Sequence, residues 1–266
     1  MRGGGGGGVA RLERSEAVVL ASRDAGEADR EVVLLTRAHG KVVAQVRGAR
    51  RVTSRLAGSL EPLATVDVML FRGGRRTTVT GAAHAQPFRA LRSDLGRFLA
   101  ANVFAEALDA LVPVGDVTDG LYALAVGGLE FLASEADADL ALAFVLTKLL
   151  ALLGYAPTWR TCAACGRPVE GGPYGLSAAL GGVVAGPCAQ GGAPLSPPAL
   201  GALALLAEGR PAAVRRLHLA PGVRDEVRRA VWALVGQAAG RPLRSAPVYE
   251  AVAGATRPAS TVRIDP

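Results

Sequence analysis

Residues 15–46 read SEAVVLASRDAGEADREVVLLTRAHGKVVAQV, and this stretch decides the fold class of the chain. It contains short apolar runs rich in β-branched residues, at 17–20, 32–35 and 42–46. Such runs, when turn residues separate them, are typical of β-strands. The turns contain Ala25-Gly26-Glu27 and His39-Gly40, and the second is short enough for a tight hairpin. The stretch therefore predicts three consecutive strands.

Two further strands are predicted at 64–71 and 77–80, joined through residues 72–75. Five short strands within about 70 residues leave exposed sheet edges unless the sheet closes on itself. We therefore expect a small five-stranded barrel. An OB-fold is the first choice, and an SH3-like barrel is the alternative.

After Pro87 the apolar residues follow a helical spacing. Helices are predicted at 95–111, 117–134, 140–153, 198–207 and 223–239. Asp116 and Thr118 are available to cap the second of these helices, and Gly154 to end the third. The third is apolar on nearly all sides and must be buried centrally. An N-terminal barrel followed by a helical bundle makes the predicted fold class α+β.

Composition and pattern divide the chain into six segments. These are a disordered Gly-rich tail at 1–12, an OB-fold domain at 13–86, a helical domain in two parts at 87–158 and 195–245, a degenerate zinc-ribbon-like insertion at 159–194, and a loose C-terminal tail at 246–266. Glu135, Asp137 and Asp139 fall between two helices and are predicted to form a polar loop. With no membrane-spanning apolar run and no signal-peptide core, the expected location is cytoplasmic.

The basic charge is concentrated in the N-terminal third. The net charge is +7, and residues 1–81 hold 14 Lys and Arg against 8 Asp and Glu, a net of +6. A basic surplus of this kind suits a polyanionic partner, and it equally suits a solvated surface with no partner.

The segment RGARRVTSR at 47–55 carries four arginines within nine residues, directly after the third strand. Arginine side chains and a glycine that permits close approach suit contact with a phosphate chain. Loops at the rim of an OB-fold are also where oligonucleotides bind. The alternative is a solvated basic loop. Phe71 is the one aromatic residue in the barrel region, so binding is expected to depend on charge more than on stacking.

Cys162 and Cys165 form a CxxC turn followed by Gly166, and Cys188 is the third cysteine of the chain. A four-cysteine zinc site needs a second such pair, but its fourth position, three residues before Cys188, is Ala185. Zinc is therefore doubtful, and a degenerate ribbon held by packing is favoured. A redox role is less favoured, because this CxxC does not lead from a strand into a helix.

No set of residues in the sequence predicts an enzyme. The three histidines (His39, His84 and His218) have no metal or triad spacing, and no phosphate-binding GxxxxGK[ST] motif occurs. We therefore expect a binding protein.

Four stretches resemble the RecO family of bacterial recombination mediators. They are SEAVVLASRDAGEADREVVLLTRAHGK (15–41), QVRGARRVTSRLAGSLEPLATVDVMLFRG (45–73), KLLALLGYAPTWRTCAACGR (148–167) and GGVVAGPCA (181–189). They occur in order and, with the helix that follows, extend the resemblance from about Ser15 to Arg244. The RGARR-x-x-SR-x-AG-x-L-x-P and LLALLGYAP-to-CxxCG patterns are its specific parts.

The resemblance implies an OB-fold, a helical bundle and a small zinc-ribbon-like insertion. It also implies binding of single- and double-stranded DNA, strand annealing, and work with RecR in the RecF pathway to load recombinase on DNA coated by single-strand-binding protein (SSB). DNA contact is carried over to Arg47, Arg50, Arg51 and Arg55. Ala185 departs from the zinc-binding pattern.

The same resemblance implies contact with the acidic C-terminal tail of SSB, and a location at the nucleoid. The basic, partly apolar helix at 223–239 is a candidate site for that tail, with Arg224, Arg228 and Arg229 as possible cations. A core-packing helix with a solvated basic face is the alternative. For the whole chain, the competing class is an RNA-binding or ribosome-associated OB-fold protein, which the charge pattern equally allows.

Overall fold

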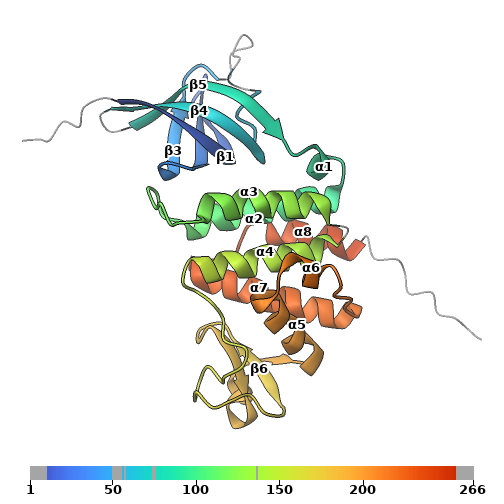
Figure 1. The fold of residues 1–266 in the computed structure, drawn as a ribbon. Helices are drawn as coiled ribbons and strands as arrows, with labels where there is room; N and C mark the ends of the chain where they lie inside the picture. The colour runs from blue at the N-terminus through green and yellow to red at the C-terminus, as the bar shows by residue number, and fades with distance from the viewer. Residues whose placement is uncertain (1–10, 50–55, 57, 74–75, 136, 256–266) are drawn as a thin grey trace, which may run out of the picture.

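The structure, a computed structural model, describes residues 11–49, 56, 58–73, 76–135 and 137–255. An N-terminal barrel, a helical body and a small sheet-containing lobe follow one another along the length of the molecule (Figure 1). This arrangement confirms the predicted α+β class. No helix within the described ranges is long and apolar enough to cross a membrane.

The N-terminal strands form a closed barrel with the order β1-β2-β3-β5-β4. The strands are β1 (Arg11–Ala25), β2 (Asp29–Thr36), β3 (Gly40–Val46), β4 (Ala64–Gly73) and β5 (Arg76–Pro87). Strands β3 and β5 pair in parallel, through Ala44 with Thr77 and Gln45 with Thr78, and the other neighbours are antiparallel. The predicted five-stranded OB-fold barrel is confirmed. The predicted disordered tail at 1–12 is wrong at its end, because Arg11 and Leu12 already pair with β4.

Strands β1 and β2 are buried on both faces. Val19 and Leu34 point into the barrel core, whereas Val18, Leu20 and Leu35 belong to the core shared with the helices. The apolar runs of these strands are continuous because both sides of the sheet are covered here. Helices α2 and α3 lie directly beneath this face of the barrel (Figure 1).

The β2–β3 hairpin fixes the barrel to the helical body. Gly40 has a φ of +60°, and a Cβ built on it would lie 1.7 Å from the carbonyl oxygen of Asp116. Beside it, Lys41 Nζ donates to the Asp109 carbonyl oxygen at 2.5 Å and to the Asp109 carboxylate at 3.2 Å. The Gly115 N–H donates to the Lys41 carbonyl oxygen at 2.7 Å. Only glycine fits this contact, since any side chain would overlap the backbone.

The helical body is built from α1 (Arg89–Arg92), α2 (Leu95–Leu111), α3 (Leu121–Ser134), α4 (Ala138–Leu152), α5 (Pro197–Glu208), α6 (Pro211–Val214), α7 (Pro221–Ala239) and α8 (Ala246–Ala255). As predicted, α4 is central, and ten of its fifteen residues are buried. Helix α3 begins four residues later than predicted, because the Asp116 carboxylate closes a turn by accepting hydrogen bonds from the Thr118 N–H and hydroxyl. The predicted polar loop is also shorter, since Asp137 caps α4 and Asp139 lies within it.

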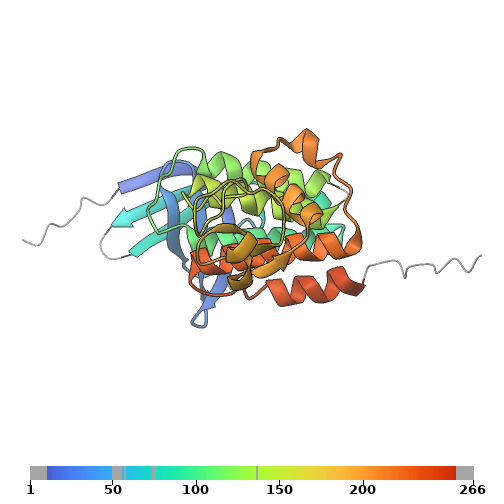
Figure 2. The same ribbon diagram turned by 90° about the horizontal axis from the view of Figure 1, so that it is seen from below.

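The predicted loose tail at 246–266 is wrong for its first ten residues, which form α8 beside α7 (Figure 2). Glu106 on α2 accepts hydrogen bonds from the Arg244 and Ser245 N–H groups, at 2.9 and 2.8 Å. A carboxylate at the start of a helix satisfies N–H groups that have no partner within the helix. Burial acts to raise the pKa of Glu106, but the hydrogen bonds from Ser245, Arg244 and Arg241 outweigh it and lower that pKa. Tyr249 is buried against Trp232 of α7.

A small lobe between α4 and α5 contains β6 (Tyr174–Ser177), β7 (Gly182–Ala185), the 3₁₀ helix η1 (Gly186–Gly191) and β8 (Ala193–Leu195). Its sheet has the order β7-β6-β8. Trp159, Leu176 and Val183 join the core of the helical body, and Arg160 forms two hydrogen bonds with Glu208 of α5, at 2.7 and 2.5 Å. The lobe lies at the end of the molecule away from the barrel (Figure 1).

We predict that Gly40→Ala destabilises the protein much more than Gly26→Ala. Both glycines have positive φ, but a Cβ on Gly26 would meet no atom within 4 Å. Gly26→Ala should therefore lower the free energy of unfolding only by the left-handed backbone penalty, about 1–2 kcal/mol. Gly40→Ala adds a backbone collision. Urea unfolding of both variants measures the difference, and equal losses would mean that the hairpin contact is not rigid.

Candidate nucleic-acid interface

The outward faces of β3, β4 and β5 form an open groove of about 590 Å³ on the barrel. It is lined by Gln45, Arg47, Leu56, Phe71, Gly73, Arg76, Thr78, Val79 and Thr80. This face is free because the helices cover the outward face of β1 and β2 instead. The groove therefore occupies the side of the barrel that the fold leaves open to a partner.

Strand register places three groove residues in one row. Thr78 of β5 is directly opposite Gln45 of β3 on one side and Phe71 of β4 on the other. Directly opposed residues on adjacent strands point to the same face. Phe71 is 39 % exposed, although its neighbour Leu70 is fully inside the barrel. An aromatic ring and two hydrogen-bonding side chains thus lie side by side across the groove.

The groove is positively charged. Arg47 and Arg76 are both exposed, and neither has a carboxylate partner within the described part of the chain. No carboxylate is among the residues that line the groove. Three other hollows differ in this respect: one carries Asp94, Glu135, Asp137 and Asp139, a second Asp116 and Asp119, and a third Glu16, Asp67 and Glu130. Among these four hollows, the barrel groove suits an anionic ligand best.

Of the arginines predicted to contact DNA, the structure places Arg47 in this groove. Arg50, Arg51 and Arg55 lie outside the described residues. Gly48 next to Arg47 has a φ of +64°, and its N–H donates to the Asp29 carboxylate at 2.8 Å. This turn directs the chain out of β3 and holds Arg47 at the groove.

The arginines predicted to receive an acidic tail lie on α7, where two of them are already paired. Arg224 contacts Asp137 at 2.7 Å. Arg228 is only 16 % exposed and contacts Asp225 at 2.7 Å and Asp139 at 3.4 Å. Asp139 also accepts a hydrogen bond from the buried Tyr249 hydroxyl at 2.8 Å. These contacts tie α7 and α8 to the start of α4.

The remaining arginine of that set, Arg229, is exposed. Arg215, which follows α6, pairs with Glu135 at 2.8 Å. The arginines at 215, 224 and 228 therefore meet alternate acidic residues of the segment 135–139. Sequence reasoning treated the basic and the acidic residues separately and missed that they face each other.

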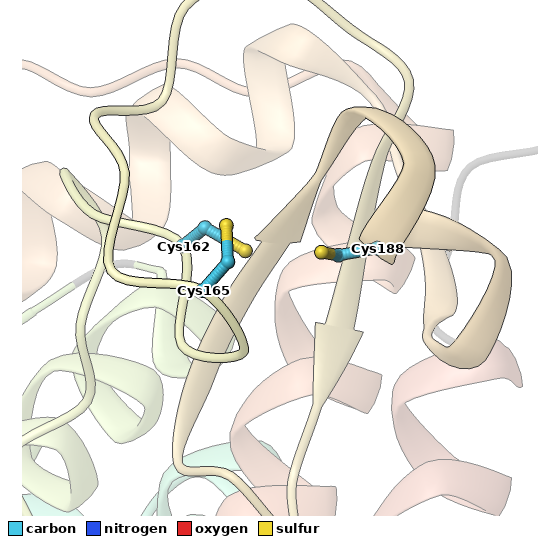
Figure 3. Close-up of side chains that lie close together, drawn as sticks. All are labelled: Cys162, Cys165 and Cys188. Carbon is cyan, nitrogen blue, oxygen red and sulfur yellow. The ribbon is translucent and has the colours of Figure 1, made fainter.

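The three cysteines converge in the lobe. The sulfur atoms of Cys162, Cys165 and Cys188 all lie within 4.8 Å of one another, with Cys188 facing the other two from η1 (Figure 3). Hydrogen bonds from the Ala185 and Cys165 N–H groups lower the pKa of the Cys162 thiol to about 6. Hydrogen bonds with Cys165 and Cys162 raise the pKa of the Cys188 thiol. The cluster can hold a metal ion.

The cluster does not contain a complete set of ligands for structural zinc, which is four-coordinate in almost all such sites. Within the described residues, no His, Asp, Glu or further Cys joins the three thiols. Position 185 supplies only a backbone N–H to the Cys162 sulfur.

Family comparisons agree with the domain arrangement. The model described as Recombination protein O N terminal matches residues 11–88, and that described as Recombination protein O C terminal matches residues 92–247. The chain belongs to the RecO family.

Relatives in this family are similar over most of their length. The DNA repair protein RecO of Heliobacterium modesticaldum is 40 % identical over 200 residues, 74 % of this chain and 72 % of that protein. That of Nocardioides sp. is 38 % identical over 216 residues, 77 % of this chain and 88 % of that protein. That of Anaeromyxobacter sp. is 38 % identical over 232 residues, 85 % and 91 % of the two chains. This RecO-family chain is therefore a DNA repair protein.

Of the residues that line the RecO barrel groove, sequence reasoning assigned only Arg47 to DNA contact. It did not assign Arg76 or Thr78, and it named Phe71 without placing it in the groove. The alternation of β4 contains a signal for Phe71, because side chains on a strand point alternately inward and outward. Leu70 is buried in the barrel core, so Phe71 must face outward. No comparable signal identifies Arg76, which is the first residue of β5.

We predict that Arg228→Ala destabilises the protein by about 3 kcal/mol, because it leaves the Asp139 and Asp225 carboxylates without their guanidinium partner. Arg229→Ala is the matched control, since the neighbouring side chain is exposed. It should change stability by less than about 0.5 kcal/mol. Chemical denaturation measures both. Equal effects would show that the ion pairs of Arg228 contribute nothing to stability.

Proposed function

We propose that this protein binds DNA through the barrel groove, anneals complementary strands, and acts as a recombination mediator. In this role it helps load recombinase on SSB-coated DNA, in the cytoplasm at the nucleoid. The observation that carries the proposal is the groove with Arg47, Arg76 and an exposed Phe71 and no carboxylate. Membership of a family of DNA repair proteins supports the choice of DNA as the anionic ligand.

The groove offers both kinds of contact that a single strand uses. Guanidinium groups attract the phosphate chain, and an aromatic ring stacks on a base without regard to its identity. Thr78 and Gln45 add hydrogen-bonding groups in the same row. Arg50, Arg51 and Arg55 continue the basic segment that leaves β3 at Arg47, and we include them in the proposed DNA contact.

Annealing by this protein requires no catalytic residue, and we propose that it is not an enzyme. Two complementary strands repel each other through their phosphates. A basic surface that neutralises both strands lowers this repulsion and raises their local concentration. Base pairing then supplies the sequence recognition.

We further propose RecR and the acidic SSB tail as partners. Within the helical body, Arg229 is the exposed cation of α7, whereas Arg224 and Arg228 are engaged by carboxylates. A tail that ends in a carboxylate and apolar side chains needs a cation next to an apolar pocket. The hollow beside α7 is lined by Asp94, Glu135, Asp137 and Asp139 and does not include Arg229, so we do not place the acidic tail in it.

The double substitution Arg47→Glu, Arg76→Glu should weaken DNA binding and slow annealing of SSB-coated strands. Loss of each phosphate contact should flatten the log–log salt dependence of single-strand affinity by about 0.7, so by about 1.4 for both. A salt series of fluorescence anisotropy titrations measures the slope, and strand annealing is followed by fluorescence without nucleotide.

Arg216→Glu is the charge control for this pair, because Arg216 is exposed on the helical body, away from the barrel. It changes the net charge without touching the groove, and the slope should remain as in wild type. A double variant that binds and anneals like wild type would show that the groove is only a solvated face.

Phe71→Ala should weaken binding to single-stranded DNA by roughly 5- to 150-fold, the effect of removing about 1–3 kcal/mol of base stacking. Duplex affinity should change less, because the bases of a duplex are stacked on each other. Phe71→Tyr retains the ring and should restore binding. Leu180→Ala, which truncates another exposed apolar side chain in the lobe, is the control. An equal loss of duplex and single-strand affinity would contradict a stacking role.

We propose that the lobe folds without zinc. Support comes from Trp159, Leu176 and Val183, which pack into the core of the helical body, and from the missing fourth ligand. Protein purified without added zinc should hold much less than one zinc per chain, and EDTA should leave its Tm unchanged. One tightly held zinc per chain, or a Tm that falls on chelation, would overturn this proposal.

A further inference from the structure

The three thiols of the lobe approach each other from two separate segments. Cys162 and Cys165 lie in a turn between α4 and β6, and Cys188 lies on η1 after β7 (Figure 3). Backbone hydrogen bonds hold the first segment against the sheet: the Ala163 N–H donates to the Val183 carbonyl oxygen at 2.8 Å. The Cys162 N–H donates to the Arg167 carbonyl oxygen, also at 2.8 Å. The spacing of the sulfurs is therefore set by the fold of the lobe.

This donor set contains three sulfurs and nothing else within the described residues. Ala185 stands where a second CxxC pair would have its first cysteine, and its N–H donates to the Cys162 sulfur. A tetrahedral zinc ion would therefore lack one protein ligand. Three soft sulfur ligands match the preference of Cu(I), which thiolates bind in place of harder ions.

The surroundings of the sulfurs suit a bound univalent ion. Cys162 is buried, Cys188 is half-buried and Cys165 is exposed, so an ion has access from one side. Three thiolates around a univalent ion carry two net negative charges. Arg167 lies beside the cluster, since its carbonyl oxygen accepts a hydrogen bond from the Cys162 N–H at 2.8 Å, and its positive charge offsets part of this negative charge.

We propose that Cys162, Cys165 and Cys188 form a three-coordinate thiolate site for Cu(I). Binding is a ligand exchange without electron transfer: Cu(I) leaves the ligands of its donor and forms three Cu–S bonds, and each cysteine that is still protonated releases its proton to solvent. The bound ion links the turn after α4 to η1. The site is at the end of the molecule away from the barrel, so it is independent of the proposed DNA contact (Figure 1).

The test uses the reduced full chain under anaerobic conditions, titrated with Cu(I) against a chromophoric Cu(I) chelator. Wild type should take one Cu(I) per chain and develop a sulfur-to-copper charge-transfer band in the near ultraviolet. Cys188→Ser leaves two thiols. This variant should lose the charge-transfer band, and it should compete with the chelator for Cu(I) at least tenfold less well than wild type. Circular dichroism and single-strand DNA affinity of this variant should match wild type, which shows that it is folded.

Ala185→Cys is the matched gain-of-ligand variant. Because it supplies a fourth sulfur, this variant should bind zinc about a hundredfold more tightly than wild type. That factor corresponds to one ligand's share of the binding free energy of a structural zinc site. Wild-type zinc affinity as tight as that of Ala185→Cys would overturn the proposal, because a fourth ligand would then already be present. Cu(I) binding that survives Cys188→Ser, or no Cu(I) binding by wild type, would also overturn it.

Discussion

The burial of one outward face of the barrel on the helical body determines what the rest of the molecule can do. The outward-facing apolar side chains of β1 and β2 are removed from water because they pack into the core of the helices. They are Val18, Leu20, Val33 and Leu35. At about 1.5–3 kcal/mol for each buried side chain, this face contributes roughly 6–12 kcal/mol before the entropy cost of folding. Gly40 and Lys41 then fix the orientation of the barrel on the helical body. Gly40 lies too close to the Asp116 backbone to carry a side chain, and Lys41 donates a hydrogen bond to Asp109. The face made by β3, β5 and β4 remains open, and it carries the groove.

The arginines of this chain serve two roles, and their neighbours decide which. Arg228 faces three carboxylates in a mostly buried position, so its charge is used within the fold. Arg47 and Arg76 have no carboxylate partner in the described part of the chain, so their charge is directed at solvent. Guanidinium groups without a carboxylate partner attract phosphate from a distance. Those paired with a carboxylate attract it much less, because the two charges largely cancel. A count of basic residues therefore indicates a polyanion but does not locate its site.

Much of the fold was predictable because its signals are local. Runs of β-branched residues predicted the strands, and the apolar composition of 140–153 predicted a centrally buried helix. Helix α8 was missed because it depends on a distant residue: Glu106 accepts hydrogen bonds from the residues that begin it. The pairing of Arg228 with Asp139 was missed for the same reason, since it joins residues 89 positions apart. The cysteine cluster was predictable from spacing, and the outward position of Phe71 from strand alternation, although only Arg47 was assigned to the groove.

The central claim is that single-stranded DNA lies across β3, β5 and β4. Photo-cross-linking with an oligonucleotide that carries 5-iodouracil tests it most directly, with the modified peptides identified by mass spectrometry. A single strand bound there should cross-link within residues 45–80, with Phe71 as a principal site, and competition by unlabelled single strands should remove the cross-links. Cross-links confined to the helical body or to the cysteine-containing lobe, with none on the barrel, would contradict it.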